Sequence, residues 1–265
     1  MIQISLADEE YAIKQFRIKV LNKIYSVNAG HYSSNFSSIE LIYIFYKYFV
    51  NVQLADFILS KPHAATTQYA MLHELGYISD EIFRSFCQYK SDMIFLPTKA
   101  INGINFGVGA VGQGLSVSIG MALGYKHNGN SKKIGILAGD GELNEGSMWE
   151  AIMFAGHNKI DNIILIIDQN GLQASGRTED IISLRNVDKA MEAFAWKIIK
   201  INGHNIQEVK DAYSETINYK DGPIAIIAET VKGKGVKFME GDHLWHRKKM
   251  SMEEYEQALL ELNDE

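Results

Sequence analysis

The sequence has one cysteine among its 265 residues, Cys87, and lacks any long apolar run. A single cysteine cannot form an intramolecular disulfide, and no metal-ligand spacing surrounds it, so we expect a reducing, cytoplasmic location. Aromatic neighbours on both sides predict that the thiol is buried and unreactive. The most apolar stretch, Ile39 to Val50, is too short to span a bilayer, and the first residues lack the basic-then-apolar order of a signal peptide. We therefore expect no membrane partner.

Positive charge is also scarce, with 26 Lys and Arg residues against 32 Asp and Glu residues and a net charge of -6. No basic stripe is visible, which argues against nucleic acid as a partner. A hydrophobic content of 46% and a charged content of 22% are typical of a soluble globular protein. The length fits one α/β domain over residues 1–265, in which an N-terminal helical region of roughly residues 1–90 packs on a sheet core.

The most informative stretch begins with an apolar run, Ile134 to Ala138, that breaks into Gly139-Asp140-Gly141. A helical segment follows, and a second apolar run, Ile163 to Ile167, leads to Asn170. This order predicts a strand, a crossover helix and a parallel strand. The fold class we predict is α/β, with a central, mainly parallel sheet flanked by helices. Asp140 and Asn170 would then lie at the carboxyl ends of two strands, where parallel sheets bind ligands.

Asp140 and Asn170 offer the hard oxygen atoms that magnesium or calcium prefers. Glycines on both sides of Asp140 would let the backbone close on a diphosphate, and the helix that follows would offer free amide donors. Gly-Asp-Gly alone is also an ordinary turn. Together with the strand before it and Asn170 at the end of the next strand, it predicts a site for a metal and a diphosphate.

Two further segments offer candidate ligands. A glycine-rich segment, Phe106 to Gly114, precedes a predicted helix; such segments favour phosphate ligands but are common. His31 lies in a predicted loop, Ala29 to Phe36, where a histidine is most often a solvated side chain. Ser37-Ser38-Ile39-Glu40 is typical of a capping box that would open a helix through Val50. His204 is interpreted as a structural residue of a turn.

Apolar periodicity predicts the remaining elements. Helices are expected over residues 6–27, 66–75, 77–90, 114–126, 188–195, 206–219 and 251–265. Strands are expected over 196–201 and 224–228, and loops over 91–106 and 177–184. In the last helix Tyr255, Leu259 and Leu260 form an apolar stripe that we expect to pack on the surface.

The segment GDGELNEGSMWEAIMFAGHNKIDNIILIIDQNGLQASGRTEDI resembles the thiamine diphosphate motif and, more narrowly, the amino-terminal part of transketolases. The likeness extends from about Phe16 to Trp245. The resemblance implies the thiamine diphosphate-binding fold, with thiamine diphosphate and Mg²⁺ as cofactors and Ca²⁺ as a substitute for Mg²⁺. It also implies transfer of a two-carbon ketol unit from a ketose donor to an aldehyde or keto-sugar acceptor.

The same resemblance implies roles for individual residues. The metal would be held by Asp140, Asn170 and the main-chain carbonyl of Leu172. His31 and His246 would contact substrate hydroxyl groups and move protons, since imidazole titrates near neutral pH. The cofactor would be bound by His63, Gly109, Ala110, Val111, Gly112, Gly114, Gly141, Glu142, Asn170 and His246.

No segment resembles the second transketolase domain, which supplies the glutamate that activates the cofactor. The resemblance therefore implies a partner subunit carrying this C-terminal, pyrimidine-binding half, without which the chain is inactive. Glu145 and Glu150 match acidic positions at the family's dimer contact, which implies an α2β2 heterotetramer. The same two glutamates also fit a solvated helix start.

Several positions depart from the family pattern. Pro62 replaces the glycine of Ser-Lys-Gly-His-Ala, Leu96 to Lys99 lacks the histidine of Gly-His-Pro, and Arg247 replaces the glycine after His246. The cofactor half is intact while the substrate half has drifted, so we do not expect the standard pentose phosphates. Ketol addition to a keto or activated sugar in surface-polysaccharide synthesis is one hypothesis. A 2-oxo acid decarboxylase or dehydrogenase subunit, and a non-catalytic scaffold of the same fold, are the alternatives.

Overall fold

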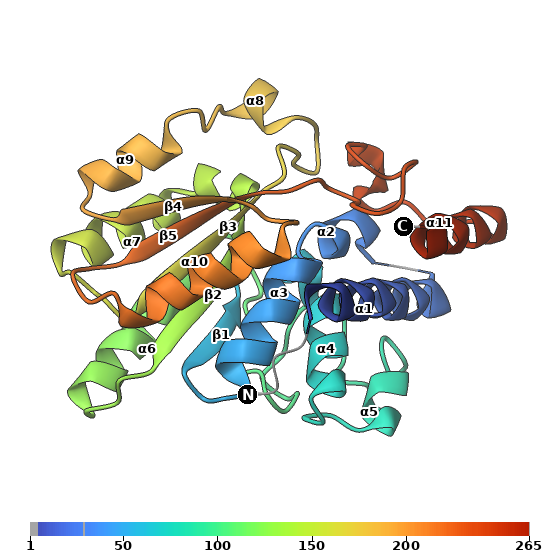
Figure 1. Ribbon diagram of the computed structural model, residues 1–265, viewed down its shortest axis with the longest axis horizontal. Helices are drawn as coiled ribbons and strands as arrows, with labels where there is room; N and C mark the ends of the chain where they lie inside the picture. The colour runs from blue at the N-terminus through green and yellow to red at the C-terminus, as the bar shows by residue number, and fades with distance from the viewer. Residues whose placement is uncertain (1–4, 29, 265) are drawn as a thin grey trace.

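The computed structural model describes residues 5–28 and 30–264, which build a sheet of five strands between helices (Figure 1). The strand order is β1-β2-β3-β5-β4, and each neighbouring pair is parallel. This confirms the predicted α/β class. The strands are β1 (Ala55–Leu59), β2 (Lys133–Gly139), β3 (Ile163–Gln169), β4 (Lys197–Asn202) and β5 (Ile224–Glu229).

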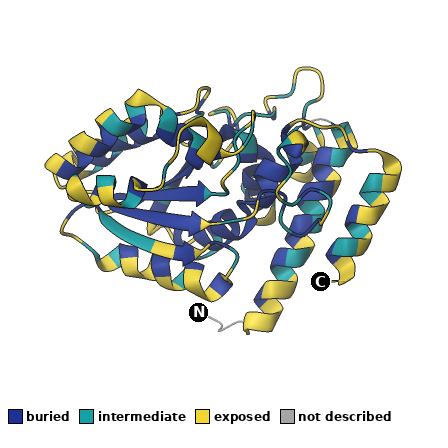
Figure 2. Ribbon diagram, turned by 90° about the horizontal axis from the view of Figure 1, so that it is seen from above, coloured by how far each residue is buried: buried dark blue, intermediate teal, exposed yellow. Residues whose placement is uncertain are grey.

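Isoleucine-rich strands place one hydrophobic cluster on each face of the sheet. In β3, Ile164 and Ile166 belong to the cluster that includes α1, α3, α4 and α10, whereas Ile163, Leu165 and Ile167 belong to the cluster beneath α6, α7 and α9. Side chains alternate across a strand, so a strand buried on both faces needs apolar residues at every position. Figure 2 shows the buried strands between helices whose outer faces are exposed.

The helices follow the predicted periodicity in most places. On one face lie α1 (Leu6–Val27), α3 (Ile39–Phe45), α4 (Ala65–Glu74) and α10 (Ile206–Asn218), and on the other α6 (Gly114–His127), α7 (Gly146–His157) and α9 (Val187–Ala193). The last helix is α11 (Met252–Asp264). Within residues 5–28 and 30–264, no helix is long and apolar enough to cross a membrane.

The predicted strand-helix-strand unit is confirmed. β2 and β3 pair in parallel with Gly139 opposite Asp168, and α7 connects them after a short 3-10 helix, η3 (Asp140–Asn144). Because both strands end at the same edge, Asp140 and Asn170 leave the sheet side by side. The residues that the resemblance assigned to the metal therefore meet at one edge of the sheet.

The segment before α3 was predicted wrongly. Residues 32–36 form a buried helix, α2 (Tyr32–Phe36), where a loop was expected; Ala29, in the same predicted loop, lies outside the described residues. The capping box is absent, because the hydroxyls of Ser37 and Ser38 donate to Asp168 at 2.8 and 2.7 Å. α3 ends at Phe45 and continues as a π-helix, η1 (Tyr46–Val50).

Other boundaries also differ from the prediction. The helix expected over residues 77–90 is reduced to α5 (Asp80–Arg84), and the loop over 177–184 contains α8 (Thr178–Ile181). β1, η2 (Pro62–Ala64) and η4 (His243–His246) were not predicted. In α11, Leu260 is 60% exposed, and Ala258 and Leu262 are the buried residues, so the predicted stripe lies one position off.

Candidate functional site

A cavity of about 260 Å³ lies at the carboxyl ends of the strands. Among the residues assigned by resemblance, it is lined by His63, Val111, Asp140, Gly141, Glu142, Asn170, Leu172 and His246. Ser34, Lys61, Glu145 and Lys232 also contribute to the wall. These residues come from seven different segments of the chain, so the sheet edge gathers what the sequence separates.

Asp140 is a buried carboxylate that no cation of the described chain contacts. Its oxygens accept hydrogen bonds from the amides of Gly141 and Gly171, each at 2.8 Å, and from the Thr178 hydroxyl at 3.1 Å. Burial, followed by the negative charge of Asp168, raises the pKa of Asp140 to about 6. A divalent cation beside this carboxylate would offset both effects.

The segment from Asn170 to Leu172 completes the oxygen set. The Asn170 amide donates from Nδ2 to Asp168 Oδ1 at 3.1 Å, and its Oδ1 accepts from the Leu172 amide at 3.2 Å. The main-chain carbonyl of Leu172 accepts from Lys232 Nζ at 3.0 Å. A carboxylate, an amide oxygen and a carbonyl oxygen are the ligand types that Mg²⁺ and Ca²⁺ bind, so these residues fit a hard divalent cation.

Lys232 was not predicted from the sequence as a site residue. It is 3% exposed, donates to the carbonyls of Leu172 and Gln173, and lines the cavity. Burial, followed by the charge of Lys61, lowers the pKa of Lys232 to about 8. A buried ammonium whose described partners are neutral carbonyls favours an anionic ligand beside it.

Lys61 and Asp168 form a buried ion pair at 2.6 Å behind the cavity. Lys61 Nζ also contacts the hydroxyls of Ser37 and Ser38 at 2.9 and 3.0 Å. Burial alone would raise the pKa of Asp168, but Lys61 and the hydroxyl donors hold it well below its usual range. This network ties α3 to the ends of β1 and β3, and it explains why the two serines do not cap α3.

The glycine-rich segment is joined to the Gly-Asp-Gly turn by Glu142. Its Oε1 accepts from the Gly112 amide at 2.8 Å and the Ser60 hydroxyl at 2.6 Å, and its Oε2 accepts from the Gly139 amide at 2.8 Å. A Cβ on Gly114 would lie 2.4 Å from Ser60, so only glycine fits there. Gly109 and Ala110 are exposed, and Val111 reaches the cavity lining.

Three histidines pack against one another at the outer side of the cavity. The ring centroids of His31 and His63 lie 4.2 Å apart, those of His31 and His246 5.0 Å, and those of His63 and His246 4.9 Å. Arg247 Nε donates to His31 Nε2 at 3.3 Å, and Ser34 Oγ lies 3.3 Å from His246 Nδ1.

All three imidazoles are uncharged at neutral pH. Burial, followed by the nearby positive charges, lowers the pKa of His31 to about 2, of His63 to about 4 and of His246 to about 3. The sequence argument for His31 and His246 relied on titration near neutral pH, which the structure contradicts. Their chemistry in the free chain is that of neutral hydrogen-bond donors and acceptors.

The three rings could also be considered as ligands of a transition metal, because their nitrogen atoms lie within 4.8 Å of one another. Positive charge argues against this interpretation. Lys61, Lys232 and Arg247 all lower the pKa of His63, and the same charges would repel a metal cation. The cluster is better suited to an anionic or hydroxyl-bearing ligand.

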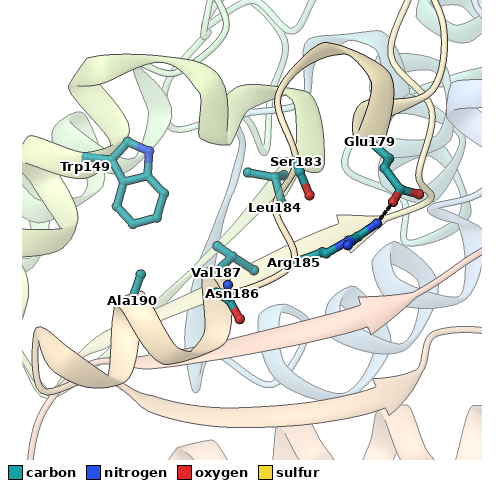
Figure 3. Close-up of a pocket in the computed structure, with 8 residues that line it drawn as sticks. All are labelled: Trp149, Glu179, Ser183, Leu184, Arg185, Asn186, Val187 and Ala190. Atoms are coloured by element: carbon teal, nitrogen blue, oxygen red, sulfur yellow. Dashed lines mark hydrogen bonds and ion pairs between the residues drawn. The ribbon is translucent and has the colours of Figure 1, made fainter.

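A larger cavity of about 690 Å³ lies between α7 and the segment from α8 to α9 (Figure 3). Its lining includes none of the residues assigned by resemblance. Its polar groups are largely paired, since Arg185 binds Glu179 and Trp149 Nε1 donates to the Leu143 carbonyl at 2.7 Å. The smaller cavity, with its buried charges, is the candidate site.

Similar proteins agree with this geometry. The family model described as the transketolase thiamine diphosphate-binding domain matches residues 8–262. An apulose-4-phosphate transketolase subunit of Actinobacillus succinogenes is 38% identical, with 94% of this chain and 93% of the relative covered. A 6-deoxy-6-sulfo-D-fructose transketolase subunit of Clostridium sp. is 30% identical, with 99% and 98% covered. Human transketolase is 32% identical over 94% of this chain but 41% of its own length.

Solved structures show the same fold. The transketolase of Campylobacter jejuni superposes with a TM-score of 0.85 at 27% identity and covers 95% of this chain and 43% of its own. A transketolase of Pichia stipitis superposes with a TM-score of 0.87 at 23% identity, covering 96% of this chain and 40% of its own.

Proposed function

Because the chain belongs to the transketolase family through its thiamine diphosphate-binding domain, we propose that it is the N-terminal subunit of a two-subunit transferase. The reaction is transfer of a two-carbon ketol unit from a ketose donor to an aldehyde or keto-sugar acceptor. The whole chain, residues 1–265, acts as one diphosphate-binding domain. Relatives that are named as transketolase subunits, and that are covered over nearly their full length, support a division into two chains.

The cofactors are thiamine diphosphate and Mg²⁺, for which Ca²⁺ is a substitute. Asp140, Asn170 and the carbonyl of Leu172 hold the metal. When bound, thiamine diphosphate supplies a nucleophilic carbon and an electron sink for breaking a bond next to a carbonyl. The buried charge of Lys232 offers a donor to the diphosphate oxygens, a role that the sequence had not suggested. Diphosphate donors assigned by resemblance are His63, His246 and the amide of Gly141.

The remaining cavity residues shape the site around these groups. Gly109, Ala110 and Val111 approach the cofactor ring, while Gly112, Gly114 and Glu142 keep this segment against the Gly-Asp-Gly turn. His31 and His246 contact sugar hydroxyl groups as neutral imidazoles. A neutral imidazole both donates and accepts a hydrogen bond, which suits a hydroxyl that must be held and stripped of its proton.

The partner is a transketolase-like C-terminal, pyrimidine-binding subunit, and two copies of each chain form an α2β2 assembly. Full-length transketolases match this chain over 41% of their length, which leaves the remainder to such a partner. Leu123 on α6 and Met153 and Phe154 on α7 are 42%, 44% and 48% exposed. Apolar side chains gathered on two neighbouring helices are suited to association. A cytoplasmic location is part of this proposal.

The observation that carries the proposal is the buried Asp140, whose pKa is raised to about 6 and which lies beside an asparagine and a carbonyl that Lys232 contacts. The test is calorimetry of thiamine diphosphate and Mg²⁺ with the chain and its partner, together with an assay of ketol transfer. Asp140→Ala should abolish both binding and turnover. Asp221→Ala, at an exposed position before β5, is the matched control and should change neither.

The rival functions give different results in the same experiment. A 2-oxo acid decarboxylase or dehydrogenase would consume pyruvate and leave ketose phosphates untouched. A scaffold would bind no cofactor even with the partner present. Unchanged cofactor binding and turnover in Asp140→Ala would overturn the proposed site.

A further inference from the structure

Arg247 is the outermost charged side chain of the histidine cluster. The residue is exposed, and its Nε donates to His31 Nε2 at 3.3 Å. Among residues 5–28 and 30–264 it makes no ion pair and no other hydrogen bond. The two terminal nitrogens of its guanidinium are therefore available, and they point to a ligand that accepts hydrogen bonds.

The backbone around Arg247 is held at both sides. Trp245 is 2% exposed and packs on Phe238 with ring centroids 5.2 Å apart. Farther along, Asn28 and Met250 exchange two hydrogen bonds of 3.0 Å, between Asn28 Nδ2 and the Met250 carbonyl and between the Met250 amide and Asn28 Oδ1. Anchors before and after Arg247 present its side chain at a defined position beside His31.

Other cations near the cavity have partners in the described chain. Lys61 is paired with Asp168 at 2.6 Å, and Lys232 donates to carbonyl oxygens. Lys248, next to Arg247, is paired with Glu254 at 2.6 Å. This leaves Arg247 as a planar cation whose fork fits two oxygen atoms of one anion.

The order of the residues sets where such an anion would lie. His63 and His246 line the cavity, His31 packs on both rings, and Arg247 binds the outer side of His31. A sugar whose reacting carbonyl lies at the cofactor end extends past His31. Its opposite end then reaches Arg247.

We propose that Arg247 is a specificity-determining residue whose guanidinium binds an anionic group, a phosphate ester or a carboxylate, at the end of the sugar farthest from the cofactor. Nε–H remains on His31, and the two terminal nitrogens bind the anion. That the ligand is a sugar rests on the proposed function. That the ligand is anionic rests on the charge and contacts of Arg247.

Three ketoses with one carbon skeleton test the proposal: D-fructose 6-phosphate, D-fructuronate and D-fructose. Their binding to the assembled, cofactor-loaded complex is measured by calorimetry, and their kcat and KM by ketol transfer. The wild type should bind one of the anionic ketoses more tightly than D-fructose, and which one identifies the anion as phosphate or carboxylate. Arg247→Gly should weaken that binding by at least about tenfold and leave D-fructose unchanged.

Two further variants separate binding from structure. Arg247→Lys retains the charge without the fork and should fall between the wild type and Arg247→Gly. Lys220→Gln removes an exposed charge between α10 and β5, at the opposite edge of the sheet, and should change nothing. A KM effect confined to anionic ketoses supports anion binding, whereas an equal fall in kcat for all three ketoses assigns Arg247 to the orientation of His31.

The proposal is overturned if the wild type binds neither anionic ketose more tightly than D-fructose, or if Arg247→Gly affects all three alike. Calorimetry needs no turnover, so it judges Arg247 separately from the reaction. A complex that binds an anionic ketose through Arg247 but transfers no ketol unit would refute the proposed reaction and leave the anion site standing.

Discussion

Lys232 is the residue at which the structure adds most to the sequence. It is buried in the cavity wall, and its described hydrogen-bond partners are two carbonyl oxygens. A lysine in a Lys-Gly-Lys-Gly run carries no local signal of burial, so the sequence interpretation treated the run as a connection. Only the packing of the segment after β5 against residues 172–173 gives the ammonium its place.

We predict that Lys232→Met weakens binding of thiamine diphosphate to the assembled complex by about tenfold or more, because a charge-assisted contact to the diphosphate is lost. Lys234→Met is the control: Lys234 lies two residues away, is partly exposed and pairs with Glu240 at 3.5 Å. Calorimetry of the two variants decides the matter. Equal affinities would remove Lys232 from the diphosphate site.

The lowered pKa values of His31, His63 and His246 predict how stability changes with pH. An unfolded histidine takes up a proton below a pH of about 6.5, whereas these three do so at about 2, 4 and 3. Their contribution to stability is therefore complete above about pH 6.5 and is lost as the pH falls toward the folded values. Asp140, whose pKa is raised to about 6, acts in the opposite direction.

We expect the urea midpoint of the metal-free chain to fall between pH 7 and pH 5, with the histidines outweighing Asp140. Replacing all three histidines with glutamine should make this fall smaller, since the variant no longer takes up these protons on unfolding. Urea unfolding of both proteins at the two pH values measures the difference. The same fall in both would show that the cluster is not the cause.

At the scale of elements, the sequence predicted what periodicity and chain order determine. The strand-helix-strand unit around Asp140 and Asn170 was predicted within about a residue, because long apolar runs have few alternative interpretations. Ser37 and Ser38 were misread as a capping box because their hydroxyls bind Asp168, a partner about 130 residues away. Local rules cannot include such a contact.

Gly135 in β2 gives a test of how the helix layer packs on the sheet. A Cβ there would lie 2.2 Å from Cζ of Phe45, the last residue of α3. We predict that Gly135→Ala lowers the free energy of unfolding by about 1–3 kcal/mol through overpacking. Nothing lies within 4 Å of a Cβ at Gly120 in α6, so Gly120→Ala should be neutral or stabilising.

Chemical denaturation of the isolated chain compares the two variants. Adding Phe45→Leu to Gly135→Ala should recover part of the loss, because the smaller side chain relieves the overlap. If Gly135→Ala and Gly120→Ala had equal effects, the close contact between β2 and α3 would not limit the packing.

For the whole molecule, one sheet edge holds the buried carboxylate, the buried lysine and the three histidines, and another surface is left apolar. The sequence placed Asp140, Asn170, His63 and His246 through family resemblance, and the structure brings them to one cavity. The sequence could not give the charge balance of that cavity, because the pKa values depend on burial and on groups from distant segments. The Lys61–Asp168 pair, 107 residues apart, is the clearest instance.

The exposed apolar side chains on α6 and α7 predict how the molecule assembles. In the proposed α2β2 complex this face is covered, so Met153→Asp combined with Phe154→Asp should prevent assembly, because a carboxylate placed in an apolar contact loses its hydration. The unfolding midpoint of the isolated chain should stay the same, since the two side chains are 44% and 48% exposed. Leu260→Asp, at a position of α11 that is 60% exposed, is the matched control. Light scattering during size-exclusion chromatography of each variant with the partner subunit measures the mass. A full-size complex with the double variant, or a reduced one with Leu260→Asp, would place the contact elsewhere.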